Sequence, residues 1–401
     1  MVINDNIHAL RPWSTLPASE EETRYRQLVE QHGSPLLVVD EAQLRIQFRQ
    51  LQAALPGVGL YYAVKALPQQ AVINALVAEG AGLDLASRRE ISMAQQSGVM
   101  PRNTIHTHPI KKDAEIRAAL RFGTTTFVID NQEELKKFYR YRSRVGLVVR
   151  LRFQGESAVV DLSSKFGCEP SEAMALLRQA KAYGIRIKGF SFHVGSQSAL
   201  PNSHVHAIHS SMALMREAWR EGMDELNLLD IGGGFPVSYR QVATTIDQFC
   251  EPIRNAVAAL PGRVHVIAEP GRYLVAPAAS VVTSVVGKSE RDGCPWYYLD
   301  DGVYGSWSGK IYDHADYPVE VFRQGPTRES VLAGPTCDSI DILEHSIGLP
   351  ELDMGDLVIG RQMGAYTAAS ATDFNGLPRA EAIVINSLDE PVNRSSRSNR
   401  S

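Results

Sequence analysis

The feature that most constrains the fold of this sequence is a regular alternation of short apolar runs with longer segments of helical periodicity. Segments such as 68–79, 170–184 and 243–259 place apolar residues three and four positions apart, as one face of a helix requires. Strands that alternate with helices predict parallel βαβ units, and eight such strands fit one closed (β/α)8 barrel. The strand-like runs are residues 58–65, 82–87, 104–108, 125–130, 145–153, 187–195, 226–232 and 264–269.

An open, doubly wound parallel sheet is the alternative fold for a repeat of this kind. That fold usually contains fewer strands, and its glycine-rich turn follows the first strand. Here the three consecutive glycines, Gly232 to Gly234, follow the seventh strand-like run. The sequence therefore favours the closed barrel.

The pattern changes after the eighth run, where short β-like segments follow one another with almost no helical periodicity. A helical pattern at 19–32 precedes the barrel. We predict a barrel over residues 34–275 and a mostly β domain formed by residues 276–388, which residues 1–33 join. Residues 389–401 are polar and are expected to form a disordered tail. The β-like segments are 279–287, 295–300, 318–323, 329–333, 356–360 and 381–387.

Composition excludes several classes of protein. The 401 residues contain 41 Lys and Arg against 45 Asp and Glu, so the net charge of −4 argues against a nucleic-acid binder that relies on overall positive charge. No apolar run approaches the ~18 residues of a membrane span, and the N-terminus lacks a signal-peptide pattern. The four cysteines form no close pairs, which predicts neither disulfides nor a zinc site. We therefore expect a cytoplasmic protein without metal, nucleic-acid or membrane partners.

Polar residues that are unusual in strands occur at or near the ends of six of the eight runs. In a (β/α)8 barrel, functional residues collect at the carboxyl ends of the strands, so this coincidence predicts a site there. The residues are Lys65, Asp84, Ser87, Arg150, His193, Ser196, Gly232, Gly233, Gly234, Glu269 and Arg272.

Lys65 has two interpretations. A lysine at a strand end can simply reach solvent, which on its own is the commoner case. A half-buried lysine at the barrel mouth can instead lose its charge and act as a nucleophile or Schiff-base former.

The loops after the seventh and eighth runs predict a phosphate site. Glycines let backbone N–H groups approach an anion closely, and barrels often bind phosphate in these two loops. Arg272 and Ser196 can add donors to the cradle. Lysine together with a phosphate cradle points to pyridoxal 5′-phosphate (PLP), with Glu269 as partner of the pyridine nitrogen and His193 stacked on the ring.

The motifs resemble those of the ornithine decarboxylase family, the PLP decarboxylases of the alanine-racemase fold, from about residue 34 to 387. The resemblance implies a PLP-binding barrel followed by a β domain, in a head-to-tail homodimer with shared active sites. One departure is Leu67, where the family usually has Asn. The motifs are YAVK, DLAS–x2–E (84–90), LSSKFG (162–167), FHVGS, LDIGGGFP, AEPGRY, DDGVYGS (300–306), YDHA (312–315), GPTCDSIDIL (334–343) and MGAYTAASATDFNG (363–376).

The resemblance implies a role for each matching residue of the barrel. Lys65 matches the Schiff-base lysine, His193 the residue on the pyridine ring, and Glu269 the partner of the pyridine nitrogen. The family's phosphate-binding positions correspond in this chain to Ser196, Gly232, Gly233, Gly234, Arg272 and, from the β domain, Tyr366. Polar positions around the site match Asp84, Glu90, Arg150 and Lys165.

The resemblance also implies roles for residues of the β domain. Cys337 matches the proton donor and Asp338 a substrate contact, and a second subunit supplies both. Asp313, next to Tyr312, matches the carboxylate that holds the distal amine of the substrate.

The function implied is PLP-dependent decarboxylation of a basic L-amino acid, with ornithine giving putrescine first and lysine giving cadaverine second. Diaminopimelate decarboxylase is a rival, although it typically carries Cys-Glu where this chain has Cys337-Asp338. A catalytically inactive regulator is a second rival, although Lys65, His193 and Glu269 are all present. Alanine racemase shares the architecture but lacks the GGGFP, EPGR and GPTCD motifs.

Overall fold

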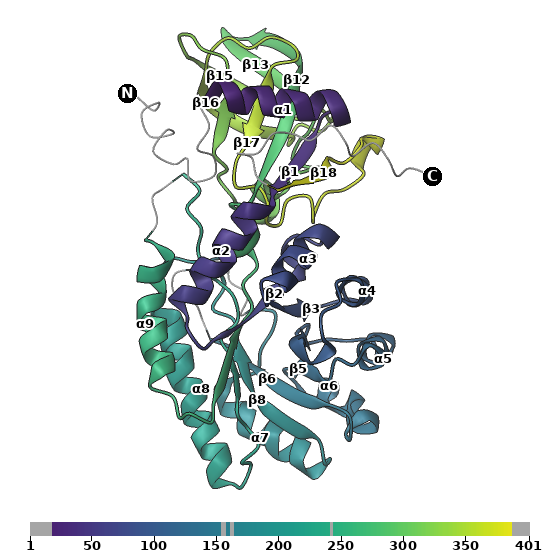
Figure 1. Ribbon diagram of the computed structural model, residues 1–401, viewed down its shortest axis with the longest axis vertical. Helices are drawn as coiled ribbons and strands as arrows, with labels where there is room; N and C mark the ends of the chain where they lie inside the picture. Colours follow the sequence, from purple (N-terminus) through teal and green to yellow (C-terminus); the bar gives the residue numbers. More distant parts are fainter. Residues whose placement is uncertain (1–17, 154–157, 161–163, 241–243, 387–401) are drawn as a thin grey trace. The chain divides into compact units, whose positions relative to one another are not determined.

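The computed structural model describes the chain in four stretches, and these fold into two compact units (Figure 1). One unit is the predicted barrel, here called the barrel unit, and the other is the predicted β domain, here called the β unit. The described stretches are residues 18–153, 158–160, 164–240 and 244–386. Of these, residues 45–237 and 244–274 belong to the barrel unit, and residues 18–44, 238–240 and 275–386 to the β unit.

Eight parallel strands close the barrel in the order β10-β11-β2-β3-β4-β5-β6-β8. This order follows the chain once around the barrel, so the predicted (β/α)8 architecture is confirmed. Each predicted strand-like run coincides with one strand. The strands are β2 Gly59–Ala63, β3 Gly82–Leu85, β4 Thr104–His106, β5 Thr126–Ile129, β6 Gly146–Leu151, β8 Arg186–Phe192, β10 Leu228–Asp230 and β11 His265–Ala268.

Helices lie outside the strands of the barrel unit (Figure 1). Local capping fixes where they begin and end: Ser87 accepts the Glu90 N–H at the start of α4, and Gly123 ends α5 with a φ of 108°. These boundaries set the short loops that carry polar groups at the strand ends. The helices are α3 Gln70–Ala78, α4 Arg88–Gln96, α5 Asp113–Phe122, α6 Gln132–Lys137, α7 Pro170–Ala182, α8 Asn202–Arg220 and α9 Ile246–Ala258.

The β unit contains a sheet in the order β14-β17-β12-β13-β15-β16, to which β1 and β18 are added. The prediction of a mostly β second domain is therefore confirmed. Its strands are β1 Leu36–Asp40, β12 Ala279–Arg291, β13 Cys294–Leu299, β14 Val319–Val321, β15 Arg328–Ala333, β16 Ile342–Leu349, β17 Leu357–Gly360 and β18 Glu381–Ile385.

The expected domain boundary at residue 34 would place strand β1 in the barrel, but β1 belongs to the β unit. It pairs antiparallel with β12, Leu36 opposite Val282, and parallel with β18, Leu36 opposite Glu381. The two units therefore divide at Leu44, about one strand later than expected. All five residues of β1 are buried, and a strand buried on both faces has the same apolar sequence in a barrel as in a packed sheet.

The N-terminal helix α1 (Ala18–His32) belongs to the β unit. Its Tyr25 and Leu28 pack in an apolar cluster with Leu36, Val38 and residues of β12 and β17. The buried guanidinium of Arg361 lies 2.8 Å from Glu21 of the same helix and 2.6 Å from Glu320. Apolar packing and a buried ion-pair network thus anchor this helix within the β unit, whereas residues 1–17 of the predicted N-terminal segment lie outside the described residues.

Two further predictions concern the surface and the termini. The predicted polar tail, residues 389–401, lies outside the described residues. Within the described stretches, every helix is too short or too polar to cross a bilayer.

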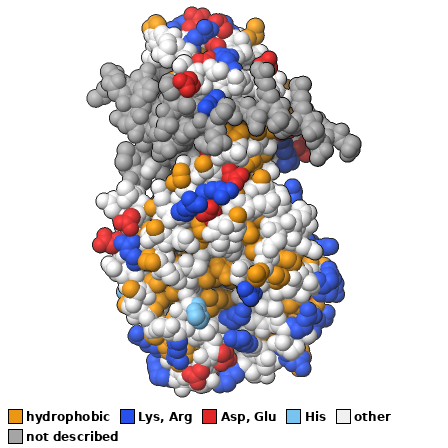
Figure 2. Space-filling model, viewed as in Figure 1, with side chains coloured by type: hydrophobic (Ala, Val, Ile, Leu, Met, Phe, Trp, Pro, Cys, Tyr) orange, Lys and Arg blue, Asp and Glu red, His pale blue; other side chains and the backbone are white. Residues whose placement is uncertain are grey.

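The visible face of the barrel unit carries more Lys and Arg than Asp and Glu (Figure 2), whereas the whole chain has an excess of acidic residues.

Candidate active site

Lys65 lies directly after β2, in the short turn Val64–Ala66 whose other two side chains are buried. Its Nζ atom is 3.3 Å from Oδ2 of Asp84, the last residue but one of β3. The Lys65 side chain is 43% exposed, whereas that of Asp84 is 1% exposed. The buried side chains of Val64 and Ala66 therefore fix the backbone of Lys65. Its amine lies beside a buried carboxylate at the carboxyl end of the barrel strands.

Asp84 is held by its surroundings. The Thr107 hydroxyl donates a short hydrogen bond to Asp84 Oδ1. Glu90, at the start of α4, accepts the Ala86 N–H at 2.5 Å. Burial, with a smaller contribution from the negative charge of Asp84, raises the pKa of Glu90 to about 7. The predicted polar positions Asp84 and Glu90 thus lie together next to Lys65.

His193 follows β8 and faces the glycine loop. Its Nδ1 accepts the Gly195 N–H at 3.1 Å, while its Nε2 lies toward Gly233. Burial lowers the pKa of His193 well below its ordinary value, and the charges of Arg150 and Lys65 lower it further. The imidazole is therefore neutral at physiological pH, and a neutral flat ring suits stacking against an aromatic cofactor.

Gly232, Gly233 and Gly234 follow β10 and leave no room for side chains. Gly232 and Gly234 have φ values of 66° and 99°, which favour glycine. A Cβ at Gly232 would lie 2.2 Å from Phe192 O, and one at Gly233 would lie 2.9 Å from Glu269 O. The loop is therefore packed against the residues that follow β8 and β11, and only glycine fits there.

Arg272 and Ser196 join the glycine loop from two other strand ends. Arg272 donates to the Ser196 hydroxyl through NH2 at 3.0 Å and through Nε at 3.3 Å. Arg272 is only 5% exposed and opens α10 (Arg272–Val275). A buried guanidinium, a hydroxyl and a glycine backbone form the donor set that a phosphate ester requires.

Glu269 directly follows β11 and lies beside Asp230, which ends β10. Burial raises the pKa values of both carboxyl groups, and the negative charges of Asp230 and Asp84 raise that of Glu269 further. Asp230 also accepts the Gly232 N–H at 2.9 Å. The two buried carboxyl groups therefore lie together after neighbouring strands, where their negative charge would stabilise a nitrogen base held as its cation. The sequence analysis missed Asp230, although a polar strand end before three glycines was the available signal.

Arg150 and Lys165 lie near Phe166. The Arg150 guanidinium is 5.6 Å from the centre of the Phe166 ring and the Lys165 ammonium is 5.1 Å from it. Burial lowers the pKa of Arg150, and the charges of Glu269 and Asp130 oppose that shift. Arg150 is thus the buried cation that balances the carboxylates of the barrel mouth. Two residues of the 162–167 motif, Leu162 and Ser163, lie outside the described residues.

The remaining predicted residues belong to the β unit. The Tyr304 hydroxyl donates to Asp338 Oδ2 at 2.5 Å, and Cys337 beside it has an exposed thiol. Tyr312 ends the short helix α11 (Gly309–Tyr312) with 64% of its surface exposed, and Asp313 follows it. Tyr366 has a φ of 56°.

Asp341 organises the two motifs of the β unit and was also missed. It accepts the Val303 N–H at 2.8 Å and the Thr336 N–H at 3.0 Å. A Cβ at Gly302 or Gly334 would lie 2.1 Å from Asp341 Oδ1. This buried carboxylate therefore ties the DDGVYGS loop to the GPTCDS loop that carries Cys337 and Asp338.

The barrel residues fit PLP by their chemistry. The buried Arg272–Ser196 pair and the glycine loop suit its phosphate, and Glu269 with Asp230 suits its ring nitrogen. The neutral His193 suits its ring face, and the Lys65 amine suits its aldehyde.

Comparison with known proteins agrees with this assignment. Residues 41–276 match the family model of the pyridoxal-dependent decarboxylase pyridoxal binding domain. The lysine/ornithine decarboxylase of Selenomonas ruminantium is 35% identical over 371 residues, which cover 92% of this chain and 94% of that protein.

Solved structures agree as well. The lysine/ornithine decarboxylase of Vibrio vulnificus complexed with putrescine has 51% identity and a TM-score of 0.88, covering 92% of this chain and 99% of its own. The arginine decarboxylase of Paramecium bursaria Chlorella virus bound to agmatine has 30% identity and a TM-score of 0.86, covering 91% and 100%. The chain therefore belongs to the pyridoxal-dependent decarboxylases of basic amino acids.

Proposed function

We propose that this PLP-dependent enzyme decarboxylates L-ornithine to putrescine, with L-lysine as its second substrate. The observation that carries the proposal is the 51% identity, over nearly the whole chain, to a lysine/ornithine decarboxylase complexed with putrescine. The same bacterial enzyme is also known in complex with cadaverine, at 52% identity. Both products are diamines, which require a carboxylate for the amine distant from the reacting carbon.

The acidic residues of the β unit supply carboxylates of this kind. Asp313 follows the exposed Tyr312, and Asp338 is oriented by the Tyr304 hydroxyl at 2.5 Å. We assign Asp313 to the distal ammonium of the substrate and Asp338 to a further substrate contact. Diaminopimelate carries a carboxylate at its distal end, which Asp313 would repel. That rival substrate is therefore disfavoured.

Bound PLP supplies an electron-withdrawing ring that accepts the electron pair left when carbon dioxide departs. We assign Lys65 as the residue that holds the cofactor through its amine, positioned beside Asp84. Glu269, coupled to Asp230, holds a proton at the ring nitrogen, and His193 covers one face of the ring. Arg272, Ser196 and the glycine loop bind the phosphate and fix the orientation of the ring.

The α-carbon must regain a proton after carbon dioxide has left. We assign this step to Cys337, whose thiol is exposed and lies next to the oriented Asp338. We further propose a homodimer in which the β unit of one subunit supplies Cys337, Asp338 and Asp313 to the barrel of the other. All four cysteines are free in the structure, which supports a reducing, cytoplasmic location.

A substrate panel tests the proposal. The PLP-loaded enzyme is assayed with ornithine, lysine, arginine and diaminopimelate, and both carbon dioxide and amine are measured. We expect the highest kcat/KM for ornithine, with lysine second. A preference for arginine or diaminopimelate would replace the proposed substrate, and absence of turnover with all four would favour an inactive regulator.

The variant Asp313→Ala tests the assigned specificity residue, with Asp353→Ala as the matched control. Asp353 is an exposed aspartate of the same unit that pairs with Lys288 at 3.1 Å. Loss of a charge-assisted hydrogen bond costs about 1.5–3 kcal/mol, so kcat/KM for ornithine should fall about ten- to a hundredfold. PLP binding should stay intact in both variants. Full activity of Asp313→Ala would remove Asp313 from the substrate site.

A further inference from the structure

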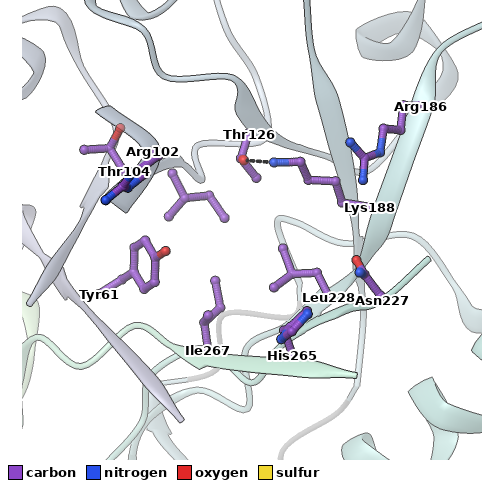
Figure 3. Close-up of a pocket in the computed structure, with 11 residues that line it drawn as sticks. Tyr61, Arg102, Thr104, Thr126, Arg186, Lys188, Asn227, Leu228, His265 and Ile267 are labelled. Atoms are coloured by element: carbon purple, nitrogen blue, oxygen red, sulfur yellow. Dashed lines mark hydrogen bonds between the residues drawn. The ribbon is translucent and has the colours of Figure 1, made fainter. Parts of the chain in front are cut away.

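The barrel unit has a cavity at the opposite end of its strands from Lys65 and the glycine loop. Its volume is about 260 Å³. It is lined by residues at or near the amino ends of β4, β5, β8, β10 and β11, whereas the residues of the candidate active site follow the carboxyl ends. Figure 3 shows the cavity with its lining side chains. The site already described therefore does not account for it.

The lining of this cavity is strongly basic. Its lining includes Arg102, Arg186, Lys188 and His265, and none of its lining residues is acidic (Figure 3). These four basic residues are here called the basic mouth. Arg102, Arg186 and Lys188 form no ion pair with any residue in the described stretches. Elsewhere the barrel unit pairs many of its cations, for example Arg178 with Glu221 at 2.6 Å. The basic mouth thus concentrates positive charge without a protein counter-ion.

Lys188 is positioned by the chain around it. Its ammonium donates to the Thr126 hydroxyl at 2.5 Å (Figure 3). Its stem crosses Gly146 so closely that a Cβ there would lie 2.5 Å from Lys188 Cε. Burial lowers the pKa of Lys188, and the charge of Arg186 two residues earlier lowers it further. A half-buried ammonium beside a like charge is costly, and a bound anion would offset that cost.

The inner wall of the cavity is apolar. Tyr61, Ile105, Leu228 and Ile267 line it, and they pack with the layer of side chains that fills the barrel interior. A ligand that uses both parts carries an anionic group for the basic mouth and an apolar body for this wall. Arginine binds phosphate through paired N–H donors, and a lysine adds a point charge.

We propose that the basic mouth binds a phosphomonoester with a small apolar or aromatic body. Arg186 and Lys188, which lie on the same side of the cavity (Figure 3), contact the phosphate, while Tyr61 and Ile267 contact the organic part. This site is separate from the PLP phosphate cradle, because the two lie at opposite ends of the same strands. For example, β10 begins at Leu228 in the cavity and ends at Asp230 before the glycine loop.

The test is calorimetric titration of the PLP-loaded enzyme with phenyl phosphate, because PLP then occupies the other phosphate site. Lys188→Met and Arg186→Gln each remove one positive charge from the basic mouth. Lys181→Met is the matched control, since Lys181 is exposed, donates to Glu221 O at 3.0 Å and does not line the cavity. We expect Kd to rise at least about tenfold in the first two variants and to stay within about twofold in the control.

Further arms separate the alternatives. Inorganic phosphate should bind more weakly than phenyl phosphate, and phenol should not bind measurably. Arg186 is exposed, so Arg186→Gln provides the test if Lys188→Met fails to fold. Equal affinity in all variants, equal binding of phenol, or loss of the PLP absorbance during the titration would each overturn the proposal.

Discussion

The Nζ atom of Lys65 lies 3.3 Å from Oδ2 of Asp84, and Asp84 is almost fully buried while Lys65 reaches the open end of the barrel. Lys65 follows β2 and Asp84 lies in the neighbouring strand β3, whose register places Asp84 opposite Ala63. A buried carboxylate that Thr107 also binds is a fixed anchor. It limits the positions that the lysine amine can take.

We predict that Asp84→Asn slows attachment of PLP to the enzyme. The amide keeps the shape but loses the charge-assisted hydrogen bond to Lys65, so the amine is held less well. The rate of PLP uptake by the cofactor-free enzyme, followed by absorbance, should fall several-fold. Asp247→Asn, an exposed aspartate paired with Arg254 at 3.0 Å, is the control and should behave as wild type. An unchanged rate in Asp84→Asn would show that Asp84 does not position Lys65.

Gly233→Ala should weaken PLP binding at least about tenfold while the fold is retained. Its Cβ would lie 2.9 Å from Glu269 O and 3.1 Å from His193 Nε2, so the loop must shift away from the assigned phosphate and ring sites. The control is Gly262→Ala, where a Cβ meets nothing within 4 Å. Spectroscopic titration with PLP gives both affinities. Equal affinities would mean that the glycine loop is not part of the cofactor site.

Stability should depend on pH through Glu90. Burial raises the pKa of Glu90 from 4.5 to about 7, so the folded protein binds this proton more tightly than the unfolded chain. The Glu90 contribution is full below pH 4.5 and is lost as pH rises through about 7.

Glu90→Gln cannot ionise and should therefore be more stable than wild type at pH 8, by roughly 1–3 kcal/mol, with little difference near pH 5. Denaturant unfolding at both pH values measures this effect. Glu133→Gln, a 79% exposed side chain, serves as the control. A Glu90→Gln variant that is less stable than wild type at pH 8 would contradict the assigned direction of the shift.

The shared active site predicts complementation between two inactive variants. Lys65→Ala and Cys337→Ala subunits, mixed and allowed to exchange, should recover about one quarter of wild-type activity. The reason is that half of the dimers regain one of two sites. Each variant alone measures the background. Proven exchange without recovery would place Lys65 and Cys337 of one site on the same chain.

The architecture could be predicted because the barrel repeats one local pattern eight times, and each strand has its own apolar run. The boundary at β1 could not, because Leu36 to Asp40 would be equally buried in either unit. Lys65, Glu269 and Arg272 could be proposed as site residues because charged residues at strand ends are conspicuous in a sequence. Asp230 and Asp341 were missed because their roles depend on partners brought together only by the fold, such as Gly302 and Gly334 for Asp341.

The central assignment is that Lys65 holds PLP at the carboxyl end of the barrel. Borohydride reduction of the PLP-loaded enzyme, followed by proteolysis and mass spectrometry of the peptides, tests it most directly. The assignment predicts a pyridoxyl group on Lys65 and on no other lysine. A label on Lys165 or Lys310, with Lys65 unmodified, would contradict it.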